Sequence, residues 1–302
     1  MASADLSCAI ITPSFRADFE QCRLLTETVS EHVAPHVRHY LTVDKRDRKL
    51  FADLRGPRTE VVLVEDVVPS WIRRPPFARR WWLSLKTPPI RNWMLQQIVK
   101  LSVAAFVPAD VLIFVDSDVF FVRSYDPIQT MRDGKVPLFR EYGEELRSEF
   151  NQRWHHVGAK LFGLEPLDDY LTSYVGNLIT WRTENVHLLH EHIENVTGRS
   201  WIESLSRLPA MSEYVLYGMF CEHILKERSG HYFDSAISSL CYWRTQKLDI
   251  AGLEELRGGL RPEHVAVMVS AKSRTPVDDI RHVFGKPAGR LASVPATGLA
   301  PA

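Results

Sequence analysis

The stretch that decides the fold is Val111-Leu112-Ile113-Phe114-Val115-Asp116-Ser117-Asp118. An unbroken apolar run rich in β-branched residues is typical of a strand that is buried on both faces of a parallel sheet. Asp116 and Asp118 follow where this strand leaves the core. Open α/β sheets bind their ligands at that carboxyl edge. We therefore expect a ligand site around this D-x-D motif.

The chemistry of the motif indicates a metal site. Carboxylate oxygens are the hard ligands that Mg²⁺ and Mn²⁺ prefer, and such an ion can hold a diphosphate. A structural explanation stands beside this one, because Asp also favours the turns that end strands. The buried strand before the motif favours the functional interpretation, since a short motif depends on its context.

Composition limits the class of protein. The chain has 302 residues, of which 45% are hydrophobic and 25% charged, as in ordinary globular proteins. Basic and acidic residues balance at 37 each, which argues against a bulk nucleic-acid binder. We expect no membrane span and no signal peptide, since no long apolar run exists and residues 1–9 lack a basic region. Four scattered cysteines without a C-x-x-C pair suggest reduced thiols and a cytoplasmic location.

Strand and helix patterns alternate along the chain before and after the motif. This alternation predicts an α/β fold, in which helices flank a mostly parallel sheet. The expected strands cover residues 8–14, 38–43, 59–64, 111–115, 173–181 and 263–270, and the expected helices begin near residues 18, 94 and 212. We expect a single domain over residues 1–286, with a nucleotide-binding half at 5–125, an acceptor half at 126–286 and a loose tail at 287–302.

The stretch between Asp66 and Asp110 contains no acidic residue. Its basic residues are Arg73, Arg74, Arg79, Arg80, Lys86, Arg91 and Lys100, and its tryptophans are Trp71, Trp81, Trp82 and Trp93. Most charge runs are solvated loops, and that explanation stays open. Arg and Trp together also suit an interface with a phosphorylated acceptor, an anionic membrane surface or a partner protein. We expect the segment from Trp71 to Trp93 to lie outside the core, at the acceptor or at the inner face of the membrane.

A family pattern is visible at this point. Thr12-Pro13-Ser14 follows the first strand, Asp44 follows the second, and a helix with Gln97 and Lys100 precedes the D-x-D strand. This order resembles the GT-A class of nucleotide-sugar glycosyltransferases, and most of all small bacterial members of uncharacterised function. The resemblance covers roughly residues 5–285 at the level of the fold. It implies a GT-A-like Rossmann-type fold, Mn²⁺ or Mg²⁺ as cofactor, and a UDP- or GDP-sugar as donor.

The resemblance also implies roles for single residues. Asp116 and Asp118 would hold the metal, with His264 as a third ligand, and Glu213 would be the base of an inverting reaction. The implied nucleotide-sugar ligands are Thr12, Ser14, Arg16, Asp44, Gln97, Lys100, Asp116, Ser117 and Asn177.

Structural explanations compete with two of these roles. Glu213 follows Ser212 at a predicted helix start, where a carboxylate stabilises the helix dipole without any chemistry. His264 is a lone histidine, and the chain departs from the glycogenin-like pattern, which places His and then Lys after the late strand. A cluster of His187, His190 and His192 lacks the H-E-x-x-H spacing, so it indicates an exposed helix and not a zinc site.

The expected function is metal-dependent transfer of a sugar from a nucleoside-diphosphate sugar to an acceptor hydroxyl. Cell-surface polysaccharide, glycolipid or secondary-metabolite synthesis would use such a reaction. One alternative is a haloacid-dehalogenase-like phosphatase with Asp116 as nucleophile and Lys272 and Asp278-Asp279 as its later residues. Another is a protein that binds nucleotide sugars without catalysis.

Overall fold

The computed structural model describes residues 6–76, 78, 80–165, 170–236 and 238–285. Arg79 and the expected tail at 287–302 lie outside these residues. Within the described part of the chain, no helix has the length and apolar character needed to cross a membrane.

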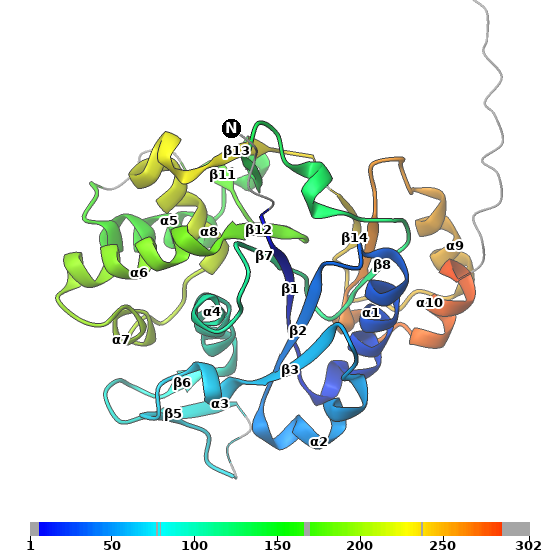
Figure 1. Cartoon of the computed structure of the whole chain (residues 1–302), viewed down its shortest axis with the longest axis horizontal. Helices are drawn as coiled ribbons and strands as arrows, with labels where there is room; N and C mark the ends of the chain where they lie inside the picture. Colours follow the sequence, from blue (N-terminus) through cyan, green and yellow to red (C-terminus); the bar gives the residue numbers. More distant parts are fainter. Residues whose placement is uncertain (1–5, 77, 79, 166–169, 237, 286–302) are drawn as a thin grey trace, which may run out of the picture.

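The central sheet has five strands in the order β12-β7-β1-β2-β3 (Figure 1). Its bounds are β1 Cys8–Pro13, β2 Arg38–Val43, β3 Thr59–Leu63, β7 Val111–Phe114 and β12 Ile179–Arg182. Strands β1, β2, β3 and β7 are parallel, and β12 runs antiparallel to β7. Predicted strands at 8–14, 38–43, 59–64 and 111–115 are therefore confirmed in position.

Burial of this sheet on both faces is confirmed by its alternating contacts. Ile11 and Phe114 pack into one apolar cluster, together with α4 (Asn92–Ser102) and α8 (Glu213–Met219). Ile10 and Ile113 point into a second cluster with α1 (Phe19–His32). A strand that fills two cores needs apolar residues at every position, which explains the unbroken run before Asp116.

A second sheet begins directly after the D-x-D motif. It has three strands in the order β14-β15-β8, with bounds Ser239–Tyr242, Ala266–Val269 and Val119–Phe121. α9 (Ile250–Gly258) and α10 (Val277–Phe284) contribute to the apolar cluster on this sheet. Asp116-Ser117-Asp118 therefore forms the bend between two sheets.

The remaining elements surround these two sheets. Helices α5 (Glu149–Phe162), α6 (Thr183–Thr197) and α7 (Trp201–Ser206) lie beside α8 on the left of Figure 1. A π-helical turn, Phe220–Leu225, continues α8. The shorter elements are α2 (Arg48–Phe51), α3 (Val64–Val67), β9 (Val136–Phe139), β10 (Glu141–Tyr142), β11 (Thr172–Ser173) and β13 (His231–Asp234).

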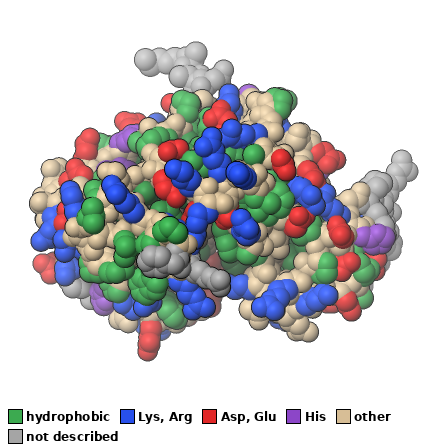
Figure 2. Space-filling model, turned by 90° about the horizontal axis from the view of Figure 1, so that it is seen from below, with side chains coloured by type: hydrophobic (Ala, Val, Ile, Leu, Met, Phe, Trp, Pro, Cys, Tyr) green, Lys and Arg blue, Asp and Glu red, His purple; other side chains and the backbone are tan. Residues whose placement is uncertain are grey.

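The basic, Trp-rich stretch forms a small antiparallel sheet of its own. Its strands are β4 (Ile72–Arg73), β5 (Trp81–Ser84) and β6 (Ile90–Arg91), at the lower left of Figure 1. Figure 2 looks at the molecule from this side and shows hydrophobic side chains exposed beside Lys and Arg. The expectation that the whole stretch avoids the core is wrong for one side of this sheet, because Ile72, Trp82 and Ile90 are buried in the core.

The two strands expected later in the chain form only in part. The strand expected over residues 173–181 is interrupted, and only β11 and β12 form at its ends. Leu178 adopts a left-handed backbone conformation with a φ of 57°, which breaks the extended chain. The late strand expected over residues 263–270 is confirmed in its centre as β15.

Candidate active site

The candidate site lies where the strand order of the main sheet reverses. β1 pairs with β2 on one side and with β7 on the other, so the loops after β1 and β7 diverge at this point. Ligands of open α/β sheets bind in the crevice outside such a switch point. The loop after β1 begins at Ser14, and the loop after β7 contains the D-x-D motif.

A buried lysine forms the centre of the site. The Lys100 ammonium lies 3.3 Å from Asp116 Oδ1 and 3.0 Å from Glu213 Oε1. It donates a hydrogen bond of 2.8 Å to the Tyr214 hydroxyl, over whose ring it also lies. Lys100 comes from α4, while Glu213 and Tyr214 open α8. Two helices far apart in sequence therefore hold one charge against the D-x-D motif.

The charge of Lys100 is held in its ionised form by its neighbours. Burial lowers its pKa, but the charges of Asp116 and Glu213 outweigh burial, so the pKa lies well above its usual value. An ammonium that keeps its proton acts as a fixed positive charge and not as a general acid. Of its two partners, Asp116 has a side chain that is 38% exposed, so Asp116 faces the open edge.

The structure contradicts the expectation that Glu213 faces an acceptor. Glu213 is 1% exposed and lies beneath Lys100, and the Gln97 side-chain amide packs against its carboxylate. Ser212 caps the helix start, as predicted, by accepting a hydrogen bond from the Val215 amide. Neither Glu213 nor Gln97 reaches the open edge with its side chain. Glu213 instead holds the Lys100 ammonium from the buried side, and Gln97 contacts Glu213.

Asp118 lies in the bend between the two sheets. Its carboxylate accepts a hydrogen bond of 2.9 Å from the Ala271 amide, which follows β15. Burial, together with repulsion from Asp116 and Asp18, raises the pKa of Asp118 from 3.8 to about 6. Asp18 is thus a third acid that contributes to the charge of this bend, although the sequence did not identify it as a site residue.

Asp18 lies immediately before α1. Ser117 donates a hydrogen bond of 3.5 Å to its carboxylate, which joins the D-x-D motif to the loop after β1. Burial is the main reason why the pKa of Asp18 rises from 3.8 to about 6, and repulsion from Asp116 adds to it. An acid placed a few residues after the end of the first strand was the signal that could have identified it.

Asp44 lies at the carboxyl end of β2 and is fully engaged with basic groups. Its carboxylate lies 2.7 Å from an Arg74 nitrogen and 3.1 Å from Arg46, whose backbone amide it also caps. Both arginines donate to the Ala78 carbonyl, at 3.1 and 3.2 Å. Arg74 was expected at an exposed interface, yet it ties the small sheet to the edge of the main sheet.

The other expected nucleotide ligands are distributed around this edge. Asn177 precedes β12 and donates to the Cys241 thiol, so it lies between the two sheets. Arg16 binds Asp47 through its backbone and its side chain, at 2.9 and 3.1 Å, and joins the loops after β1 and β2. The Ser14 backbone amide donates a hydrogen bond to the Thr42 carbonyl. Ser117 is nearly buried, at 5% exposed.

Thr12 does not match the expectation of a nucleotide contact. It is completely buried, and its hydroxyl lies 2.9 Å from the His39 ring in the core. Burial, and to a lesser extent Arg58, lowers the pKa of His39 to about 3, so the ring is neutral. The Thr12–His39 pair satisfies polar groups inside the sheet, which is a structural role.

The structure also contradicts His264 as a third metal ligand. Met268 in β15 pairs with Val119, next to Asp118, whereas His264 precedes the other end of β15. Its carbonyl accepts a hydrogen bond of 2.5 Å from Arg123, on the side away from the motif. At about 3.3 Å per residue, a strand of this length separates His264 from Asp118 far beyond any metal-ligand distance.

No group of three or more His, Cys, Asp or Glu residues is arranged to hold a metal within the described ranges. The histidines of α6 are likewise not arranged around a metal. The ring centres of His187 and His190 lie 6.2 Å apart, and the His190 ring stacks on Trp201. At the edge of the main sheet, the D-x-D motif supplies two carboxylates, Asp116 and Asp118, and Asp18 lies beside them. Mg²⁺ in phosphate-binding enzymes commonly uses one or two carboxylates plus phosphate oxygens, so this donor set fits such an ion.

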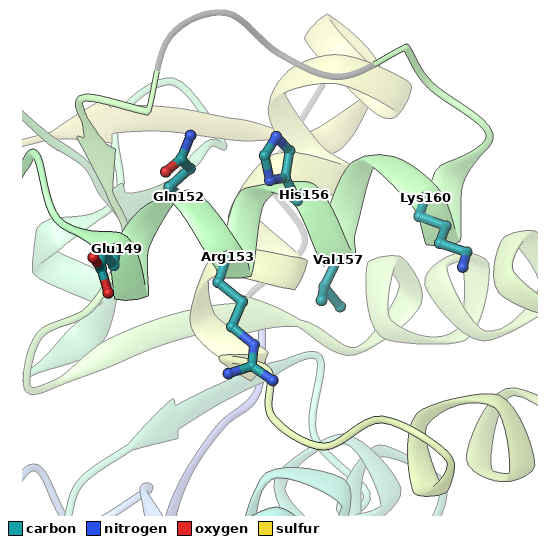
Figure 3. A pocket seen from close by; sticks show the side chains of 6 residues that line it. All are labelled: Glu149, Gln152, Arg153, His156, Val157 and Lys160. Carbon is teal, nitrogen blue, oxygen red and sulfur yellow. The ribbon is translucent and has the colours of Figure 1, made fainter.

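A shallow hollow of about 350 Å³ lies elsewhere on the surface. It is lined by residues of α5 alone, namely Glu149, Gln152, Arg153, His156, Val157 and Lys160 (Figure 3). These side chains carry both signs of charge, and none belongs to the edge of the main sheet. The hollow therefore does not bear on the chemistry around Lys100.

Comparison with known proteins places the chain in a family. No curated protein matches its sequence. A family model covers residues 4–243, which is most of the chain and includes Asp18, Lys100, the D-x-D motif and Glu213. The chain therefore belongs to DUF6492, a family of unknown function.

Proposed function

We propose that this protein is a GT-A-like, metal-dependent glycosyltransferase, which moves a sugar from a nucleoside-diphosphate sugar to an acceptor hydroxyl. One observation carries the proposal. Asp116 and Asp118 end a strand at the switch point of a parallel sheet, and a buried, permanently charged Lys100 lies against Asp116. The strand order β3-β2-β1-β7 supports a nucleotide site there, because Rossmann-type sheets share it.

Asp116 and Asp118 would hold a divalent ion together with the donor diphosphate. When bound, Mn²⁺ or Mg²⁺ supplies charge stabilisation to the leaving nucleoside diphosphate. The raised pKa of Asp18 and Asp118 supports this assignment, because burial, together with repulsion among these acids, disfavours their ionised forms until positive charge is added. Lys100 adds a fixed positive charge beside the same phosphates.

The loops after β1 and β2 would hold the nucleoside. Arg46 and Arg74 pair with Asp44, and Arg16 pairs with Asp47, so ion pairs hold the side chains of both loops before a ligand arrives. Glu213 and Gln97 keep Lys100 in place. The inverting reaction expected from an acceptor-facing Glu213 loses its support, since the carboxylate is buried under Lys100.

The phosphatase is the weaker proposal on structural grounds. Asp278 and Asp279 lie in the first turn of α10 and do not end a strand. Three strands of the main sheet also precede the D-x-D strand. We place the reaction in the cytoplasm, because all four cysteines are free and three of them are buried.

Calorimetry with UDP and GDP tests the proposed donor site. We expect affinity to fall at least tenfold when EDTA replaces Mn²⁺, and again in Asp118→Asn with Mn²⁺ present, because the metal would lose a ligand. The exposed Asp53 provides the matched control, and Asp53→Asn should bind as the wild type does. Equal affinity with EDTA, or in Asp118→Asn, would refute the metal site.

Turnover separates the remaining candidates. Release of UDP or GDP from a panel of nucleotide sugars, lost in Asp118→Asn, supports the transferase. A covalent phosphate on Asp116 after incubation with a phosphate ester would instead identify a phosphatase. Metal-dependent nucleotide binding without any turnover would favour the remaining alternative, a protein that binds nucleotide sugars without catalysis.

A further inference from the structure

We propose that the outward face of the β4–β6 sheet docks on an anionic lipid surface. We define the β5 face as Arg73, Trp81, Leu83, Leu85 and Arg91. Side chains along a strand alternate between the two faces of a sheet. In and just after β5 this alternation exposes Trp81, Leu83 and Leu85, and buries Trp82.

Cross-strand pairing completes both sides of the small sheet. Arg91 pairs with Trp81, and Arg73 pairs with Leu83, so the arginines share the outward side with these apolar residues. The inward side consists of Ile72, Trp82 and Ile90, each 2% exposed and packed into the main core. The β5 face therefore combines apolar and basic side chains without an acid.

The apolar part of this face is too exposed to be explained by the fold. Trp81 is 43% exposed, Leu83 50% and Leu85 76%, and Trp93 at the start of α4 is 45% exposed. Clustered exposed apolar side chains mark interaction sites, whereas single ones need no explanation. The Arg91 guanidinium lies over the Trp81 ring at 5.1 Å, so charge and apolar surface form one patch.

Charge selects the partner. Residues 67–109 contain no acid, although basic and acidic residues balance over the whole chain. A two-fold dimer through this face would place arginines against arginines, which is repulsive. An anionic bilayer surface satisfies both features, since its headgroups attract Arg and its interface accepts Trp and Leu.

The small sheet is held firmly to the main sheet. Arg74 joins it to Asp44, and the Ala78 carbonyl accepts hydrogen bonds from both Arg46 and Arg74. Docking through the β5 face would therefore fix the orientation of the whole domain on the membrane. Docking requires neither a metal nor a donor, so its test is independent of the transferase proposal.

Flotation of the full chain with vesicles tests the proposal. The vesicles contain phosphatidylcholine alone or phosphatidylcholine with phosphatidylglycerol. We expect binding to the anionic vesicles only, and weaker binding as salt is added. The variant Arg73→Ser/Arg91→Ser should bind roughly 25-fold more weakly, at about fivefold for each arginine. The variant Trp81→Ser/Leu83→Ser/Leu85→Ser should lose detectable binding.

Two controls carry single substitutions of the same kinds elsewhere on the surface. Trp243→Ser removes a tryptophan that is 61% exposed, and Arg153→Ser removes an exposed arginine of α5. Both should float as the wild type does, and circular dichroism should show all variants folded. Equal binding to neutral vesicles, unchanged binding of either β5-face variant, or a dimer that these variants abolish would overturn the proposal.

Discussion

The centre around Lys100 and the β5 face use similar side chains in opposite ways. At the centre, a cation touches an aromatic ring and two carboxylates, and Lys100 and Glu213 are almost completely buried. On the β5 face, Arg91 also lies over an aromatic ring, but both groups are open to solvent. The two regions lie on successive elements of the chain, β4–β6 and α4.

The difference separates chemistry from docking. A buried charge must be paired, because an unpaired one in a low dielectric costs several kcal/mol, and its position is therefore fixed. An exposed charge is solvated, so it contributes about 0–1 kcal/mol to folding and remains available to a partner. Fixed charge suits a reacting group, while available charge suits a surface that binds and releases.

Removal of the Lys100 charge should have the largest effect. Lys100→Met leaves the buried Glu213 carboxylate without a cation, so we expect a loss of about 3–5 kcal/mol in the free energy of unfolding. Urea denaturation measures it. Lys86→Met is the control on the exposed side, and it should change stability by about 0.5 kcal/mol or less.

The double variant Lys100→Met/Glu213→Leu refines this test. It removes both charges, so stability should recover much of the loss, as is common when a buried ion pair becomes apolar. Nucleotide-sugar turnover should stay lost, because the phosphates would lack the fixed cation. A double variant that is stable and fully active would remove Lys100 from the mechanism.

Two neighbouring tryptophans of β5 provide the next comparison. Trp82→Ala should cost about 3 kcal/mol, because it opens a cavity between the small sheet and α4. Trp81→Ala should cost about 0.5 kcal/mol or less, since its ring faces outward. Thermal unfolding of the pair measures both. Similar losses would mean that the β5 face is packed against something in the folded chain.

Sequence patterns identified the elements whose burial is simple. The unbroken apolar run predicted β7 and its position in a parallel sheet, because burial on both faces needs apolar side chains at each position. The same reasoning placed Asp116 and Asp118 at the edge. It also predicted Ser212 as a helix cap, since that role depends on local chain geometry alone.

Properties that depend on contacts between distant segments could not be predicted. The sequence around Glu213 favoured an acid that faces the acceptor. Its burial, however, depends on contacts with α4, which lies more than a hundred residues earlier. The Arg74–Asp44 pair and the role of Asp18 are likewise tertiary. In β5, successive side chains point to opposite faces of the sheet. This alternation could have predicted from the sequence that Trp81 and Trp82 have opposite environments.

The last prediction concerns Asp18 and the effect of pH on stability. Its pKa of about 6 in the folded chain lies above the ordinary value of 3.8, so the fold favours the neutral acid. Asp18 therefore stabilises the fold below about pH 4, and this contribution is lost as the pH rises through 6. Asp18→Asn keeps the neutral shape. At pH 7.5 it should be more stable than the wild type by on the order of 1 kcal/mol, and the difference should vanish near pH 4.

Urea denaturation of both proteins across this pH range measures the effect, with Asp53→Asn as an exposed control that should follow the wild type. Mn²⁺ should stabilise the wild type more at pH 7.5 than at pH 5, because protons compete with the metal for the carboxylates. If Asp18→Asn were instead less stable at pH 7.5, the charge of Asp18 would be a stabilising one. The acids of the bend between the two sheets would then be stabilised in their charged forms, as Glu213 is by Lys100. Their burial and mutual repulsion would no longer support a metal there.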